Sequence, residues 1–180
     1  MRALVAAAAL GLACSLAAPA AAKEVIVGVD AKAGPWLNRP NKKMRYGIGD
    51  ETPPATVTGF INDADEKLAI YPAPGATTRV DGQDVGTEGI AGEAVDDMPG
   101  AKGKYYPSLY APKILYPTNR HALIAAFVDV EGRLMGRPFA VGQGVRVTIP
   151  DQAAALTLGF NDVSFTANEG TLAVVVSMPD

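Results

Sequence analysis

The stretch that decides the fold is GVRVTIPDQAAALTLGFNDVSFTANEGTLAVVV, residues 144–176. Over residues 144–150, valine and isoleucine alternate with arginine and threonine, and this period of two predicts a β-strand with one buried face. Residues 154–160 and 171–177 predict two more strands, and a polar segment rich in Asn, Asp and Glu separates them. This stretch therefore predicts three strands joined by turns.

The chain after residue 22 continues the same pattern. Its windows lack the three-to-four-residue apolar spacing of an amphipathic helix, and Pro and Gly interrupt almost all of them. The further predicted strands are 24–30, 55–61, 66–72 and 121–129, of which the last is the most apolar and is expected to be central. Seven strands with Gly- and Pro-rich connections predict an all-β fold, specifically an antiparallel β-sandwich of the jelly-roll type.

The first 22 residues have the pattern of a secretory signal peptide. Arg2 supplies a positive charge, residues 3–13 form a short apolar core, and the alanines at 20–22 form a small-residue cleavage site. We therefore expect a signal peptide over 1–22, a single domain over 23–180, and a periplasmic or secreted protein.

Cys14 supports an alternative interpretation of the same segment. GLACS is similar to a lipoprotein signal, in which the cysteine becomes the lipidated first residue, although Gly11 stands where such a signal usually has leucine. If cleavage instead follows Ala22, the remaining chain contains no cysteine. Packing, and not disulfide bonds, is then expected to stabilise the exported domain.

Composition and charge exclude several classes of protein. The chain has 180 residues, of which 48% are hydrophobic and 19% charged, as in an ordinary globular domain. Its formal net charge of −3 becomes −4 when Arg2 is removed with the signal peptide. Such an acidic chain is not expected to bind nucleic acid. No transmembrane segment is expected, because a spanning helix needs about 20 apolar residues in succession.

Residues 74–120 form a long, glycine-rich connection with weak periodicity. Connections of this length are uncommon in compact domains and are often functional. Four tyrosines in this connection, together with Trp36, are candidates for stacking against sugar rings, because aromatic side chains suit half-apolar, hydrated contacts. The favoured alternative is that they pack the connection against the domain. The tyrosines are Tyr105, Tyr106, Tyr110 and Tyr116.

Candidate catalytic residues are scarce, and we expect no enzyme. His121 is the only histidine and no Gly-x-Ser-x-Gly motif surrounds a serine, so a Ser-His-Asp triad is disfavoured and His121 is expected to be a packed or surface residue. A hydrolase with two carboxylates from distant loops is a third hypothesis. Asp81, within RVDGQD, lies in a segment similar to a calcium loop but without its helices, which favours a polar turn.

The segment NDVSFTANEG, residues 161–170, carries the strongest local signal. Calcium is bound by about six to eight oxygen atoms from carboxylates, amide groups and backbone carbonyls on a curled loop. The same residue types are also ordinary turn chemistry, and their spacing alone favours a turn. The candidate ligands are Asn161, Asp162, Thr166, Asn168 and Glu169.

Three segments follow the order of elements of a known family. PDQAAALTLGFNDVSFTANEGTLAVVV has a strand, Asn-Asp, a short loop, Asn-x-Gly and a second strand, and this order resembles the bacterial galactophilic lectins of the PA-I type and their galactose-binding-like relatives. EKLAIYPAPGATTRVDG and ALIAAFVDVEGRLMGRPFAVGQG resemble the family's earlier strand and turn and its central strand and hairpin. The resemblance covers residues 64–180.

The resemblance implies a jelly-roll sandwich that binds a carbohydrate, with calcium as the cofactor that bridges the protein and two sugar hydroxyls. It matches Asp162 to a calcium carboxylate and Asn168 to an asparagine that contacts both the ion and the sugar. The implied calcium ligands are Asp162, Asn168, Thr166 and Asn161, and the implied carbohydrate-binding residues are Asn168, Asp162 and Asp81. Ala167 stands where the lectins have the first of two asparagines, so the fold is expected with or without the ion.

We therefore expect an exported, non-catalytic, lectin-like module that binds a glycan, with calcium assisting where the ion is retained. The alternative is a periplasmic or cell-surface β-sandwich that has a structural or protein-interaction role and takes no small ligand.

Overall fold

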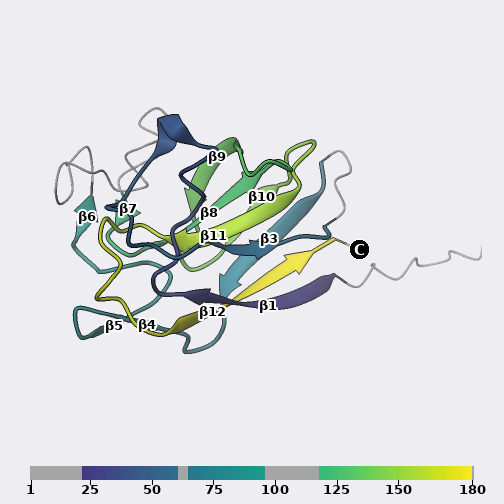
Figure 1. Ribbon diagram of the computed structural model, residues 1–180. Coiled ribbons are helices and arrows are strands. Elements are labelled where there is room, and N and C mark those ends of the chain that lie inside the picture. The colour runs from purple at the N-terminus through teal and green to yellow at the C-terminus, as the bar shows by residue number, and fades with distance from the viewer. Residues whose placement is uncertain (1–21, 61–64, 96–117, 180) are drawn as a thin grey trace, which may run out of the picture.

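The computed structural model describes residues 22–60, 65–95 and 118–179, and within these ranges the protein is all-β with antiparallel sheets (Figure 1). Each of the seven predicted strand ranges overlaps an observed strand. The strands are β1 (Lys23–Asp30), β2 (Ala55–Val57), β3 (Lys67–Pro72), β4 (Thr78–Val80), β5 (Gln83–Val85), β6 (Ala94–Val95), β7 (Thr118–Asn119), β8 (Leu123–Val128), β9 (Leu134–Ala140), β10 (Val145–Thr148), β11 (Ala155–Phe160) and β12 (Thr171–Met178), and a short 3-10 helix, η1, spans Lys42–Met44. The described residues contain no helix with the length and apolar character needed to cross a membrane.

Two four-stranded sheets form the body of the protein. One has the strand order β1-β12-β3-β10 and the other β2-β11-β8-β9. β1 pairs with β12 along its whole length, and β11 pairs with all six residues of β8. β1 begins and β12 ends on the same side of the molecule, whereas the small sheets β4–β5 and β6–β7 lie at the opposite end (Figure 1).

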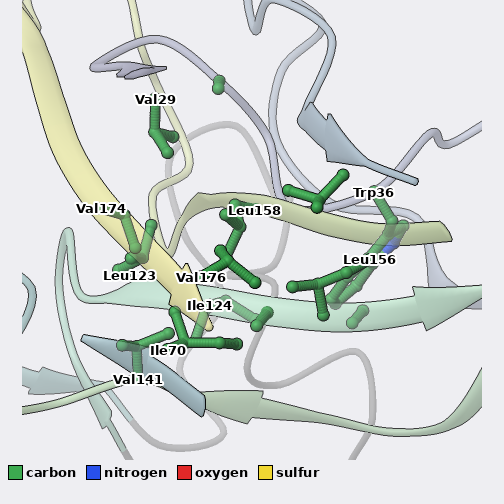
Figure 2. Packing of buried hydrophobic residues seen from close by; sticks show 14 of the residues in the cluster. Val29, Trp36, Ile70, Leu123, Ile124, Val141, Leu156, Leu158, Val174 and Val176 are labelled. Atoms are coloured by element: carbon green, nitrogen blue, oxygen red, sulfur yellow. The ribbon is translucent and has the colours of Figure 1, made fainter. Parts of the chain in front are cut away.

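One hydrophobic cluster takes side chains from both four-stranded sheets. Figure 2 shows how these aliphatic side chains meet between the strands. A fully buried side chain of this size contributes roughly 1.5–3 kcal/mol of transfer free energy, so the shared cluster stabilises the two sheets as one unit. Its members in Figure 2 include Ile70, Val174 and Val176 from one sheet and Ile124, Leu156 and Leu158 from the other.

β8 and β11 are buried at every position. Both are interior strands of their sheet, so each is paired on two edges. Their sequences LIAAFV and ALTLGF lack strict polar alternation because both of their faces are covered. The prediction that residues 121–129 hold a central strand is therefore confirmed.

β9 was not among the predicted strands. Its sequence LMGRPFA contains Gly136 and Pro138, which weaken any strand signal. β9 lies at the edge of its sheet, where a proline costs no ladder hydrogen bond on the open side. The register also shifts opposite Ala125 and Phe127, as at a β-bulge.

The predicted connection 74–120 contains β4, β5, β6 and β7 in its described parts, so it is not without structure. Short strands escape detection because two or three residues carry too little periodicity. The four tyrosines fall within residues 96–117, which lie outside the described ranges, as do Cys14 and residues 1–21 of the expected signal peptide.

Trp36 is a core residue. Its side chain is 1% exposed, its Nε1 atom donates a hydrogen bond to the carbonyl of Met44 at 2.8 Å, and its ring meets that of Tyr46 edge-on. The Tyr46 hydroxyl in turn donates to the carbonyl of Trp36 at 2.7 Å. The packing interpretation of Trp36 is therefore confirmed, and this indole offers no open face to a sugar.

Candidate functional site

A buried polar cluster lies at the end of β8 and β11, and we define it as His121, Thr78, Asp162 and Asn168. Backbone hydrogen bonds determine the positions of His121 and Asp162. The N–H of His121 donates to the carbonyl of Asn161 at 2.7 Å, and the N–H of Asn161 donates to the carbonyl of Ala122 at 2.9 Å. This pairing continues the β8–β11 ladder by one step. It brings Asp162, the next residue, beside the imidazole of His121.

The imidazole is enclosed on every side, with 0% of His121 exposed. Its ring stacks on that of Phe160, with centroids 4.0 Å apart and an interplanar angle of 4°. Nε2 lies 3.0 Å from the hydroxyl of Thr78, and Nδ1 lies 3.4 Å from the Asn168 amide nitrogen and 3.5 Å from Asp162 Oδ2. The histidine therefore joins β4, β11 and the 161–170 loop, so of the two predicted alternatives, a packed or a surface residue, it is the packed one.

Hydrogen-bond geometry limits the roles of the groups in this cluster. The Thr78 hydroxyl has one proton and two neighbours, the carbonyl of Val85 at 3.2 Å and His121 Nε2 at 3.0 Å. The Asn168 amide has two protons and three neighbours, namely Asp162 Oδ2, the Ala31 carbonyl and His121 Nδ1. Which neighbour each proton meets depends on the tautomer of His121.

Asp162 is held by protein donors on both of its oxygen atoms. The backbone N–H of Val163 donates to Oδ1 at 2.7 Å, and the Asn168 amide nitrogen donates to Oδ2 at 3.1 Å. The same amide nitrogen lies 3.3 Å from the carbonyl of Ala31. Asp162 and Asn168 expose only 4% and 2% of their surface. The structure therefore brings these two predicted site residues together, but beneath the surface.

The donor set around Asp162 does not fit a calcium ion as it stands. Calcium needs converging oxygen atoms, whereas Asn168 turns its amide nitrogen towards Asp162. Exchanging the nitrogen and oxygen of this amide would set an oxygen against two acceptors, Asp162 Oδ2 and the Ala31 carbonyl. His121 Nδ1 further occupies the approach to Oδ2.

The other two implied calcium ligands are bonded elsewhere. The amide nitrogen of Asn161 donates to the carbonyl of Asn119 at 2.9 Å. Thr166 is exposed, and both its N–H and its hydroxyl donate to Asp50 Oδ2, at 3.1 and 2.7 Å. The bonds of the Asn161 amide nitrogen and of Thr166 therefore go to Asn119 and Asp50, and not to Asp162. Within the described ranges, no three His, Cys, Asp or Glu side chains gather as a metal site.

Asp50 is the residue that fixes the 164–166 turn. Its Oδ2 atom accepts hydrogen bonds from the Ser164 hydroxyl, from the backbone N–H groups of Phe165 and Thr166, and from the Thr166 hydroxyl. Burial by itself raises the pKa of Asp50, but these donors favour the charged carboxylate and bring the pKa below its usual value. Sequence reasoning missed Asp50 because it lies more than a hundred residues from the turn that it binds.

Asp81 lies apart from the buried cluster, at the tip of the β4–β5 turn. Its carboxylate accepts a hydrogen bond from the Arg120 guanidinium at 2.9 Å, and Arg120 also binds Glu93 at 2.7 Å. Burial lowers the pKa of Arg120, but its bonds to Glu93 and Asp81 outweigh this and raise it. The side chain of Asp81 is half exposed. The turn that the sequence predicted for RVDGQD is confirmed.

Thr78, His121 and Asp162 follow one another in the order of a nucleophile, a base and an acid. The Thr78 hydroxyl, however, lies 3.2 Å from the Val85 carbonyl as well as 3.0 Å from His121 Nε2, so its proton has a second acceptor besides the imidazole. Thr78 is also buried, so its hydroxyl meets no substrate in this structure. A nucleophilic hydroxyl needs both its base and its substrate within reach. Here the three side chains anchor the β4–β5 hairpin to the core.

A second polar feature opens to solvent at the same end of the molecule. A depression of about 380 Å³ is lined by residues 72–76, residues 86–89 and Gln143, and we call it the loop-end depression. The side chains of Glu88 and Gln143 are hydrogen-bonded to each other within its lining. The Thr87 hydroxyl donates to the Gly142 carbonyl at 2.6 Å, which ties together two of the loops around it. Sequence reasoning named Asp81, in the turn that follows β4, but did not single out Glu88 or Gln143.

Comparisons of the chain with protein-family models, with curated proteins and with solved structures gave no significant match. The resemblance to galactophilic lectins therefore rests on the residues of the chain alone.

Proposed function

We propose that this protein is an exported, non-catalytic carbohydrate-binding module with a jelly-roll β-sandwich fold. The observation that carries the proposal is the loop-end depression, in which a carboxylate and an amide side chain meet at the surface of a β-rich scaffold. Its volume of about 380 Å³ lies within the usual range for small-ligand sites, roughly 300–1,000 Å³.

The hydrophobic cluster that the two four-stranded sheets share supports the proposal of a sandwich. Sheets that bury their inner faces against each other form a sandwich. Neighbouring strands such as β12 and β3 are far apart in sequence, as expected of a jelly roll, in which the chain crosses between sheets.

Glu88 and Gln143 have the chemistry to bind a sugar. A carboxylate accepts hydrogen bonds from adjacent hydroxyl groups, and a carboxamide both donates and accepts. In the free protein, Gln143 donates a hydrogen bond to the Glu88 carboxylate. A bound sugar would replace this one hydrogen bond with several bonds to its hydroxyl groups. Pro72 and Pro74 add apolar surface to the same lining.

Calcium is not needed by this mode of binding. Asp162 and Asn168 act instead as a scaffold beneath the loops, since their polar atoms are bonded to His121, Val163 and Ala31. We place the sugar at the loop-end depression above them, with Asp81 on a neighbouring turn.

A glycan array with and without calcium tests the proposal. We expect a neutral sugar to bind equally in both conditions, and Glu88→Ala or Gln143→Ala to weaken binding about tenfold or more, the equivalent of about 1.4 kcal/mol. Glu131→Ala is the matched control, because Glu131 is an exposed glutamate on the β8–β9 turn that pairs with Arg133. An array that stayed blank in both conditions would contradict the proposal.

The alternative function is a structural or protein-interaction role for the same sandwich. It is favoured by the burial of the polar cluster and by the hydrogen bonds that both oxygen atoms of Asp162 accept from Val163 and Asn168. A blank glycan array together with a stable fold would support this alternative.

A further inference from the structure

The outer face of the β1-β12-β3-β10 sheet carries a second hollow, at the end of the molecule opposite the loop-end depression. It has a volume of about 460 Å³ and lies where β1 begins and β12 ends (Figure 1). Its lining includes Lys67, Ala69, Arg146 and Ser177, and we call it the terminal depression.

Strand register places these side chains on one face. Arg146 pairs with Ala69, Ala69 pairs with Ser177, and Ser177 pairs with Glu24, so the four form a row across the sheet. Leu68 and Ile70 point into the core, so Lys67, Ala69 and Tyr71 point outward. The small side chains of Ala69 and Ser177 form the floor, and the two cations stand at its sides.

The side chain of Tyr71 extends across this face of the sheet. Its hydroxyl, which starts from β3, donates to Glu24 on β1 at 2.5 Å. The two strands are separated by β12 and therefore by about 10 Å, so the phenol ring must extend over β12 to make this bond. Val175 is the residue between Tyr71 and Ile26 in the register, and it is only 8% exposed although it faces outward. A tyrosine laid flat over Val175 accounts for this burial.

Two cations of this hollow have no ion-pair partner within the described ranges. They are Lys67 and Arg146, and both side chains are exposed. Glu24, the acid of the same row, accepts the hydrogen bond of the Tyr71 hydroxyl, and Glu66 belongs to the lining. By the strand register, the row that contains Tyr71 neighbours the row that contains Arg146 and Ala69.

We propose that the terminal depression binds a sugar that carries an anionic group, a carboxylate or a sulfate. The pyranose ring packs on the face of Tyr71, as amphipathic aromatic side chains favour. The anionic group lies between Lys67 and Arg146, where the guanidinium provides a forked pair of donors and the ammonium a point charge. Ser177 and Glu66 bind ring hydroxyls. This site uses none of the residues of the loop-end depression.

Isothermal titration tests the proposal with three probes, namely a galacturonate trimer, a sulfated galactose trimer and a neutral galactose trimer. We expect one or both acidic trimers to bind, and the double variant Lys67→Ala/Arg146→Ala to weaken that binding at least tenfold. Salt should weaken the wild-type interaction, because exposed charges are screened over about 10 Å at 0.1 M ionic strength. Inorganic sulfate alone should compete only weakly, since it lacks the ring that contacts Tyr71.

Two further variants separate binding at the terminal depression from a general effect of charge. Lys42→Ala/Lys43→Ala removes the same charge from η1, and binding should be unchanged. Tyr71→Ala should weaken binding of the acidic trimers, while circular dichroism checks that the sheet is intact. Equal losses in both lysine-containing double variants, or no binding of either acidic trimer, would overturn the proposal. Loss of neutral-sugar binding in Glu88→Ala, by contrast, reports only on the loop-end depression.

Discussion

The Nε2 atom of His121 lies 3.0 Å from the hydroxyl of Thr78, and this contact ties the β4–β5 hairpin to the start of β8. The Thr78 hydroxyl also forms a hydrogen bond with the Val85 carbonyl on β5, so the contact links both strands of the hairpin to His121. A second link, between the backbones of Arg79 and Glu169, holds the same hairpin to the polar loop. The buried histidine therefore supports the loops around the buried polar cluster and around the loop-end depression.

Replacing this histidine is expected to destabilise the whole domain. His121→Ala removes a fully buried ring from its stack on Phe160 and takes one polar neighbour each from Thr78 and Asn168. We expect a loss of about 2–4 kcal/mol in the free energy of unfolding, measured by urea denaturation. His121→Gln, which keeps a polar atom in place, should lose less. A change below about 1 kcal/mol in the alanine variant would contradict the structural role.

Calcium is expected to leave the melting temperature unchanged. An ion present at 100 times its Kd would stabilise the fold by about 2.7 kcal/mol, which is easily seen in a thermal melt. The amide nitrogen of Asn168 and Nδ1 of His121 face Asp162 Oδ2, so no such site is formed. A calcium-dependent rise that disappears in Asp162→Ala would show instead that the implied lectin site is retained.

Acid should destabilise the protein partly through Asp50. The pKa of Asp50 is lower in the folded protein than its ordinary value of 3.8, so the folded state favours the charged form. The resulting stability is therefore fully present above about pH 4, where the unfolded group is ionised, and is lost as the pH falls through the folded value. Asp50→Asn should be less stable at neutral pH and show a shallower loss between about pH 4 and pH 2. Parallel pH profiles for the two proteins would contradict this assignment.

Gly159 is expected to tolerate no side chain. A Cβ atom at this position would lie 2.2 Å from the backbone of Gly34, which belongs to the segment that packs over β11. Gly159→Ala should therefore cost about 2–3 kcal/mol or more, read from chemical denaturation. Gly86→Ala is the matched control, because its Cβ would meet nothing closer than 4.0 Å, and its change should stay within about 0.5 kcal/mol. Similar losses in the two variants would show that the close approach is not the cause.

The strands were predictable because their signal is local. Alternation over 144–150 and the unbroken apolar run at 122–128 each report burial within a single element, and both regions form strands. β9 escaped prediction because Gly136 and Pro138 are acceptable only at a sheet edge. Edge position is a property of the assembled sheet.

The loop of residues 161–170 shows that local sequence is equally insufficient to predict the candidate site. Its residue types suggested oxygen ligands, and the backbone does bring Asp162 and Asn168 together. The side chain that packs beside them is His121, some forty residues earlier in the chain, and the turn between them is bound by Asp50, more than a hundred residues earlier. No spacing within the loop contains that information.

The amino-acid sequence by itself determined the all-β class, the positions of the main strands and the place of the polar loop, because periodicity and turn residues act over a few neighbours. The tertiary structure alone decided that His121 fills the space beside Asp162, that Glu88 meets Gln143, and that Tyr71 reaches Glu24 across an intervening strand. The physical reason is that burial and hydrogen-bond partners are set by contacts between distant segments, and these exist only once the sheets have paired.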